Sequence, residues 1–436
     1  MMNDSSGECG RSIGLQHSGS AAADSDEGAC RARSLGLHQN RRADRRAVDG
    51  LSAGANTPFL KARQLFNRQL SKLPASLRGV SMDRFTSTSA IALLAAGLAF
   101  GTQPGPAVAE NNPVDEKWWP TEFGADDQAG ATNYITPEKR LEAAELVKQG
   151  KVATLGMQYH NRIPVFPGRT FALSIPGGGG PTHNLPWKGD NFRQTFMDEL
   201  VTAEIGQAGT QFDALSHPMI QVKDAKDLED GNYFYNGHRL EDIGGPRGLS
   251  ALGPEHVGSF FTRGVLIDVA ALKGVDSLDK GYVITMDDFN AALEAQGIED
   301  VKQGDVVLIR TGWNNLWRDN LEKSQDQAAA DNAEFNSGEP GVAPEVCDHL
   351  AESKASMLGM DNWGIEPYDF AAEPPSDIES WGYCHANLVT RRGIYLMENM
   401  DLKQISDDQA YEFLFAWAPL KLVGATGSPG NPIAAY

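Results

Sequence analysis

Cysteine is scarce in this sequence, with 4 residues in 436, and no two of them form a CxxC pair. Zinc ribbons and thioredoxin-like redox sites depend on such pairs and are therefore excluded. Two of the four, Cys347 and Cys384, lie in the C-terminal half of the chain. They could form a disulfide in an oxidising compartment or remain separate buried thiols, and the sequence leaves both states open.

The chain also lacks the short motifs of several large enzyme classes. There is no GxSxG, no HExxH, no P-loop and no GxGxxG after a strand-like run. The serine hydrolases, zinc peptidases and nucleotide-binding folds that use these motifs are excluded. Four glycines at 177–180 do not by themselves make a phosphate-binding loop, and we interpret them as a mobile loop.

Positive charge is in the minority, with 38 Lys and Arg against 58 Asp and Glu and a formal net charge of −20. A nucleic acid partner is excluded because binding to a phosphate backbone needs a basic face. The charge is uneven, since residues 1–109 carry 13 basic and 8 acidic side chains. This asymmetry separates an extension from a strongly acidic body.

Long apolar runs are absent, and the most apolar stretch, Ile91–Phe100, is too short for a membrane span of roughly 20 residues. Arg84 precedes it, and the small-x-small pattern Ala107–Ala109 follows. We therefore predict a signal peptide at 82–109 and a periplasmic or secreted body without stable membrane insertion. An uncleaved anchor is the alternative interpretation of this segment.

The segment 1–81 is rich in Ser, Ala, Gly and Arg and has no sustained apolar period, which predicts disorder. A signal peptide works poorly 80 residues inside a chain. We therefore hypothesise that Met82 is the working start codon and that 1–81 is not translated. N-terminal sequencing of the native protein tests this hypothesis.

The body, 110–436, has no linker or repeat and is predicted to be one α/β domain. Strand-like apolar runs occur at 264–270, 305–311 and 356–360. Capping signals predict one helix from Thr136-Pro137 to Gly150 and another over Phe289–Gln296, after the capping box that begins at Thr285. A further helix is predicted from Ser406 through Phe415.

A polar cluster interrupts the body between residues 207 and 217. In an extended segment Gln207, Gln211 and Asp213 would project from one face, because side chains alternate along a strand. His217 lies one turn beyond them. By spacing alone the cluster fits a site or a polar edge strand equally well.

This segment resembles the signature His-x-Gly-Thr-His-x-Asp, with a further His four residues on, of the putative cyclase family of kynurenine formamidase-like hydrolases. Glutamine stands at the first two histidine positions, and the match holds at Gly209, Thr210, Asp213 and His217. Short matches continue in order along nearly the whole body, at 123–137, 166–168, 304–313, 359–361, 385–388, 393–399 and 418–429.

The resemblance implies a swivelling β/β/α single domain and a site for one or two divalent ions, usually manganese or zinc. The positions of its metal ligands fall on Gln207, Gln211, Asp213, His385 and Glu398. The general acid/base position falls on His217. Substrate-binding positions fall on Phe166 and, as a residue that orients a ligand, Asp361. Related enzymes are commonly dimers, so a homodimer is also an expectation.

The two glutamines depart from the family pattern, because a carboxamide oxygen is a weaker ligand than imidazole and favours harder ions than zinc. Three outcomes remain open: a manganese-type site, a site held by Asp213, His385 and Glu398 alone, or a metal-free descendant. The leading function is hydrolysis of an amide or lactone bond in a small, aromatic metabolite, with metal-bound water as nucleophile. The alternatives are a non-catalytic periplasmic small-molecule-binding protein and a lyase or cyclase.

Overall fold

The structure is a computed structural model that describes residues 117–176, 183–188, 192–371 and 382–436. All described residues lie in one compact unit. The predicted extension, the signal peptide and the glycine run lie outside the described residues. No helix among the described residues is long and apolar enough to cross a membrane.

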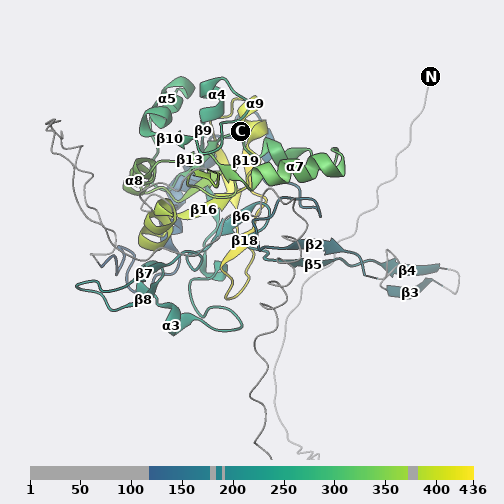
Figure 1. Ribbon diagram of the computed structural model, residues 1–436, viewed down its shortest axis with the longest axis horizontal. Helices are drawn as coiled ribbons and strands as arrows, with labels where there is room; N and C mark the ends of the chain where they lie inside the picture. Colours follow the sequence, from purple (N-terminus) through teal and green to yellow (C-terminus); the bar gives the residue numbers. More distant parts are fainter. Residues whose placement is uncertain (1–116, 177–182, 189–191, 372–381) are drawn as a thin grey trace, which may run out of the picture. The chain divides into compact units, whose positions relative to one another are not determined.

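A nine-stranded sheet forms the centre of the fold, in the order β1-β19-β17-β9-β11-β14-β16-β6-β18. Figure 1 labels its strands β9, β19, β16, β6 and β18. Its middle four strands are parallel: β9 (Phe260–Asp268), β11 (Val306–Arg310), β14 (Met357–Met360) and β16 (Tyr395–Glu398). Every residue of β11, β14 and β16 is buried, as in parallel sheets covered on both faces. The predicted α/β class and its strands are confirmed, and the swivelling β/β/α type stays a prediction.

Antiparallel strands extend the sheet on both sides of this parallel core. On one side lie β17 (Glu412–Trp417), β19 (Ile433–Ala435) and β1 (Val152–Thr154). On the other lie β6 (Gln211–Asp213) and β18 (Gly427–Pro429). The segment 207–217 therefore joins the sheet directly beside the last parallel strand.

Helices α2 (Pro137–Ala144), α4 (Val269–Lys273), α5 (Met286–Gln296) and α7 (Gln325–Phe335) begin at a side-chain cap visible in the sequence. In α5 the capping box of Thr285 and Asp288 is formed, and Gly297 ends the helix in the left-handed conformation. The others are α3 (Leu240–Ile243), α6 (Asn315–Arg318), α8 (Pro344–Glu352), α9 (Lys403–Asp407) and the π-helix η6 (His385–Arg391). Short 3-10 turns are η2 (Gly130–Tyr134), η3 (Tyr235–Gly237) and η4 (Pro254–His256).

Among the described residues, five two-stranded ribbons lie outside the main sheet. They pair β10 (Val283–Ile284) with β13 (Gly341–Val342), β12 (Gly338–Glu339) with β15 (Tyr368–Asp369), β2 (Phe171–Ser174) with β5 (Leu200–Ala203), β3 (His183–Lys188) with β4 (Phe192–Phe196), and β7 (Ile220–Val222) with β8 (Gly231–Tyr233). The β12–β15 ribbon brings Glu339 and Tyr368 together, and both residues line the cavity described below.

Two predicted helices differ from the structure. The helix predicted over 406–415 is wrong, because α9 ends at Asp407 and Glu412–Trp417 forms strand β17. Phe413 and Phe415 are fully buried there and pair with β9, so pairing and burial decide the conformation. The helix from Thr136 ends at Ala144 instead of continuing to Gly150.

Cys347 in α8 and Cys384, which immediately precedes η6, form a disulfide. It links two segments that flank the parallel core, and it resolves the alternative that the sequence left open. The cross-link closes a loop with a sequence separation of 37 residues. His385 directly follows it in the chain.

A buried ion cluster anchors α2 to the sheet. Asp305 is fully buried and accepts from Lys139 Nζ at 2.5 Å and from Arg263 Nη1 at 2.7 Å. Without the charge of Asp305, Lys139 would lose its carboxylate partner and Arg263 would keep only its pair with the exposed Glu412, and breaking a buried ion pair is costly. We expect Asp305→Asn to lower the free energy of unfolding by about 3 kcal/mol, measured by urea denaturation. The control Glu299→Gln removes an exposed pair with Lys302 and should leave the midpoint unchanged.

Candidate metal centre

Two carboxylates meet where strands β6 and β16 pair. Asp213 ends β6 and Glu398 ends β16, and the register places Asp213 opposite Leu396 and Gln211 opposite Glu398. The side chains of Asp213 and Glu398 are almost fully buried. The antiparallel pairing therefore brings together two acids that are far apart in the sequence.

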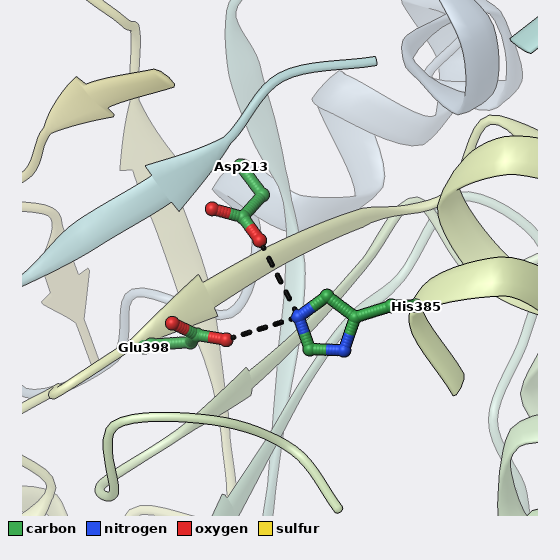
Figure 2. A group of neighbouring side chains, drawn as sticks. All are labelled: Asp213, His385 and Glu398. Atoms are coloured by element: carbon green, nitrogen blue, oxygen red, sulfur yellow. Dashed lines mark ion pairs between the residues drawn. The ribbon is translucent and has the colours of Figure 1, made fainter. Parts of the chain in front are cut away.

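His385 supplies a nitrogen between these carboxylates from the first residue of η6. Its Nε2 lies 3.6 Å from Asp213 Oδ2 and 3.4 Å from Glu398 Oε1 (Figure 2). The potential ligand atoms of the three residues all lie within 4.8 Å of one another. Within the described part of the chain, this is the one group of three or more His, Cys, Asp or Glu residues with that spacing.

Glu366 orients the imidazole of His385. Its Oε2 lies 2.9 Å from Nδ1, and its Oε1 accepts the backbone N–H of His385 at 3.1 Å. A carboxylate on Nδ1 fixes the tautomer that leaves Nε2 free to bind a cation, as in many metal centres. Glu366 was not identified from the sequence, since no motif distinguishes it from other acids.

The two glutamines contact the carboxylates through their amide groups. Gln207 Nε2 donates to Asp213 Oδ1 at 2.7 Å, and Gln211 Nε2 donates to Glu398 Oε2. Gln207 reaches the site from a turn at 205–210, and not from the extended segment predicted. Its side chain nevertheless lies beside those of Gln211 and Asp213, as the pattern indicated.

Burial and the neighbouring charges shift the pKa values of Glu398, Asp213 and His385. Burial raises the pKa of Glu398 to about 7, and the nearby charge of Asp213 adds to this. Burial opposes ionisation of Asp213 too, but the imidazoles of His217 and His385 hold its pKa below the usual range. Burial also works against a charged His385, yet Glu366 and the site carboxylates raise its pKa well above its usual value.

These residues fit a divalent cation. Asp213 Oδ2 is buried and has no hydrogen-bond partner among the described residues; the imidazoles of His385 and His217 lie 3.6 and 3.7 Å from it, and a cation could bind it more closely. One imidazole nitrogen and two carboxylate oxygens face the same point, and these are ligands that manganese and zinc accept. Asp213, His385 and Glu398 could therefore hold an ion.

His217 lies in the turn that follows β6 and approaches the same oxygen of Asp213 as His385 does. The backbone N–H of His217 donates to Ala214 O, and its Nε2 lies 3.7 Å from Asp213 Oδ2. Burial lowers the pKa of His217, Asp213 opposes this effect, and His385 and Arg169 add to it. A neutral imidazole beside the candidate ion position can accept or deliver a proton.

A cavity of about 260 Å³ opens onto this group. Its lining includes Gln207, His217, His385 and Glu398 from the centre, together with Phe166, Arg169, Glu339, Trp363, Gly364, Glu366, Tyr368 and Gly382. The ring centroids of Phe166 and Trp363 are 4.9 Å apart. Phe166, an expected substrate contact, therefore lies in the cavity wall, and Trp363 lies beside it.

Glu339 is a second acid that the sequence analysis missed. It is buried, and its Oε2 accepts the backbone N–H groups of Trp363 and Gly364 at 2.8 and 3.1 Å. Burial and then the charge of Glu398 raise its pKa well above the usual range. A protonated Glu339 would present a hydrogen-bond donor to the cavity.

Asp361 lies away from this cavity. Its Oδ1 accepts the backbone N–H and the hydroxyl of Thr311 at 2.7 and 2.6 Å, and its Oδ2 accepts the N–H of Gly312 at 2.8 Å. Asp361 is not among the described residues that line the cavity. These contacts hold the turn after β11, so the carboxylate of Asp361 is directed to that turn, although its backbone lies beside the end of β16.

A family model and one solved structure identify the family of this chain. The family model described as Putative cyclase matches residues 153–367. A crystal structure described as a novel cyclase is 32% identical over 72% of this chain and 98% of that chain, with a TM-score of 0.57. Isatin hydrolase A from Labrenzia aggregata is 19% identical over 67% and 94% of the two chains, with a TM-score of 0.41. No curated protein matches the chain.

Proposed function

The chain belongs to the putative cyclase family, and we propose that it is a metal-dependent hydrolase of an amide or lactone bond in a small aromatic molecule. One observation carries the proposal. Asp213, His385 and Glu398 converge beside a cavity, and one buried oxygen of Asp213 has no hydrogen-bond partner among the described residues. Manganese and zinc are the proposed ions.

A divalent ion lowers the pKa of a bound water towards ~7 and polarises a carbonyl oxygen. The residues of the chain supply the rest of the reaction. Asp213 and Glu398 would balance the charge of the cation, and Glu366 would hold His385 in its ligating orientation. Hydrolysis adds water to the acyl carbon, breaks its C–N or C–O bond and leaves a carboxylate.

His217 is the proposed general acid/base. Its imidazole lines the cavity and lies beside Asp213, so it can reach both an attacking water and the leaving atom. It would take a proton from the water and deliver it to the departing nitrogen or oxygen. No side-chain nucleophile is required.

The cavity wall supports a planar substrate that carries an acidic group. Phe166 and Trp363 offer aromatic faces, and Arg169 is the only Lys or Arg among the described lining residues. The guanidinium of Arg169 lies 5.5 Å over the Phe166 ring, and its Nη1 donates to Gln207 O. Its other donors can bind a carboxylate on a ring held against Phe166.

We expect Arg169→Gln to raise KM roughly 10- to 100-fold for aromatic amides or lactones that carry a carboxylate, because a charge-assisted hydrogen bond contributes about 1.5–3 kcal/mol. Steady-state kinetics on matched acid and methyl ester substrates measures the effect. The ester is the control and should show little change in KM. Equal losses for both substrates would contradict the role of Arg169 in recognising the acid.

We also propose that the body is exported to the periplasm or secreted. The disulfide between Cys347 and Cys384 supports this proposal, because such bonds persist in oxidising compartments. Fractionation of the producing cells, with detection of the chain in the periplasm or medium, tests it. Recovery with the cytoplasmic proteins would contradict it.

The hydrolase proposal is tested with the purified protein loaded separately with manganese and zinc. A panel of N-formyl arylamines, cyclic aryl amides and aryl lactones is incubated in water enriched in ¹⁸O. Hydrolysis places one ¹⁸O in the product carboxylate, detected by mass spectrometry. Turnover without ¹⁸O would indicate a lyase or cyclase, and binding without turnover would indicate a small-molecule-binding protein.

A further inference from the structure

We propose that Gln207 and Gln211 do not ligate the metal but hold Asp213 and Glu398 in position as hydrogen-bond donors, leaving a three-ligand centre for one ion. This inference rests on the proposed metal-dependent function. It changes the role that the family pattern assigns to both positions. The glutamines become positioning residues, and the ligands are Asp213, His385 and Glu398.

The hydrogen bonds divide the oxygens of each carboxylate between two roles. Asp213 Oδ1 accepts from Gln207 at 2.7 Å, while Oδ2 lies towards His385 Nε2 at 3.6 Å. In the same way Glu398 Oε2 accepts from Gln211, while Oε1 lies 3.4 Å from His385 Nε2. Each glutamine therefore holds the oxygen that is not directed at His385 and leaves the other oxygen available to an ion.

With both carboxylates ionised, as they are when they ligate a cation, the chemistry of the partners fixes the direction of both amides. A carboxylate oxygen is only an acceptor when ionised, so the amide atom that contacts it must be the nitrogen. If the amide of Gln207 were turned over, its oxygen would lie against Asp213 Oδ1 with no proton between them. In the contact between Gln211 and Glu398 the amide nitrogen is again the donor, since Gln211 Nε2 also lies 3.5 Å from the acceptor Gln207 Oε1.

The backbone around both glutamines limits their movement. Gln211 is 2% exposed and lies directly opposite Glu398 in the sheet. Gln207 donates its N–H to Glu204 O and accepts from Arg169 through its own carbonyl. A Cβ atom at Gly427, in strand β18, would lie 3.2 Å from Gln207 Nε2. Strand β18 therefore packs closely against the amide of Gln207. The amides are thus held against the carboxylates by the fold.

A centre with one imidazole and two carboxylates is poorer in nitrogen than the family pattern, which has histidine at the positions of Gln207 and Gln211. Nitrogen ligands favour zinc, and oxygen ligands favour manganese and magnesium. Replacing the glutamines with histidines would therefore raise the affinity for zinc more than that for manganese. The two glutamines explain how a family site can keep its carboxylates oriented while it loses two ligands.

The experiment measures metal binding without reference to turnover. The full-length protein, Gln207→Met, Gln211→Met and the Gln207→His/Gln211→His double variant are titrated with Mn²⁺ and Zn²⁺ and counted by elemental mass spectrometry. We expect one ion per chain in the native protein. Each Met variant should retain one ion at about 10- to 100-fold weaker affinity, as for other losses of an orienting group. The double variant should shift the Zn²⁺/Mn²⁺ affinity ratio towards zinc by 10-fold or more.

The exposed residue Gln325 provides the matched control, and Gln325→Met should bind as the native protein does. Thermal unfolding of each metal-free variant identifies one that fails to fold. Gln207→Met is the safer test if buried Gln211 does not tolerate the change. An anomalous difference map of Mn²⁺-loaded crystals then locates the ion.

Two ions per native chain, or a glutamine oxygen within about 2.6 Å of the ion, would overturn the inference alone. Absence of any retained ion at millimolar Mn²⁺ would overturn the proposed function as well. The two failures are therefore distinguishable. A single ion on Asp213, His385 and Glu398, with both amides on the carboxylates, supports it.

Discussion

Asp213→Asn should remove the retained metal ion and lower kcat/KM by about 10³-fold or more, because the lost cation supplies several kcal/mol of transition-state stabilisation. The exchange is nearly isosteric and keeps an oxygen that can accept from Gln207. It removes the negative charge and the buried Oδ2, the atom without a hydrogen-bond partner in the described part of the chain. Elemental mass spectrometry after desalting and steady-state kinetics measure the two effects.

Asp407→Asn is the control for this exchange, since Asp407 pairs with Lys403 on the surface of α9. It should leave both metal content and kcat/KM unchanged. Retention of both by Asp213→Asn would refute the metal centre. Loss of activity with the ion retained would instead assign Asp213 to the acid/base step.

His217→Asn should lower kcat by about 10²- to 10⁴-fold while the ion stays bound, because general acid/base catalysis contributes that much. The side chain lines the cavity, but its Nε2 is 3.7 Å from Asp213 Oδ2 and it is not part of the Asp213–His385–Glu398 group. A large loss of kcat with the metal content unchanged therefore distinguishes His217 from the metal ligands. The pH–rate profile provides the second measurement.

In the pH–rate profile of His217→Asn, we expect the loss of the part of the curve in which the rate follows the protonation of His217. His256, which is partly exposed and pairs with Glu255, gives the control His256→Asn. An unchanged kcat in His217→Asn would exclude it as the acid/base group. A proportional loss of metal would show that it is a ligand.

Much of the fold could be predicted from local signals. The capping box at Thr285 and the apolar run 305–311 depend on neighbouring residues, and both elements formed where expected. The stretch after Ser406 could not be assigned, because its strand β17 is stabilised by pairing with β9, about 150 residues earlier. Local propensity carries no information about that partner.

The residues of the candidate site likewise divide into those that the sequence could predict and those that it could not. Family motifs placed Asp213, His385 and Glu398 in one site, and the fold brings them together. The motifs could not show that Glu366 supports His385, because that contact depends on the path of the chain between β14 and η6. They also could not distinguish a glutamine that binds an ion from one that donates a hydrogen bond, since both use the same side chain.

Gln211 and Glu398 face each other across a single rung of the β-ladder between β6 and β16. The contact that orients a candidate ligand is therefore also one of the contacts that sets strand alignment. A shift of the three-residue strand β6 by one position would turn Asp213 and Gln211 to the opposite face of the sheet. Insertions or deletions in the turn at 205–210 are consequently expected to displace the site residues before they disrupt the packing of the core. For engineering, the length of that turn is as important as the identity of any ligand.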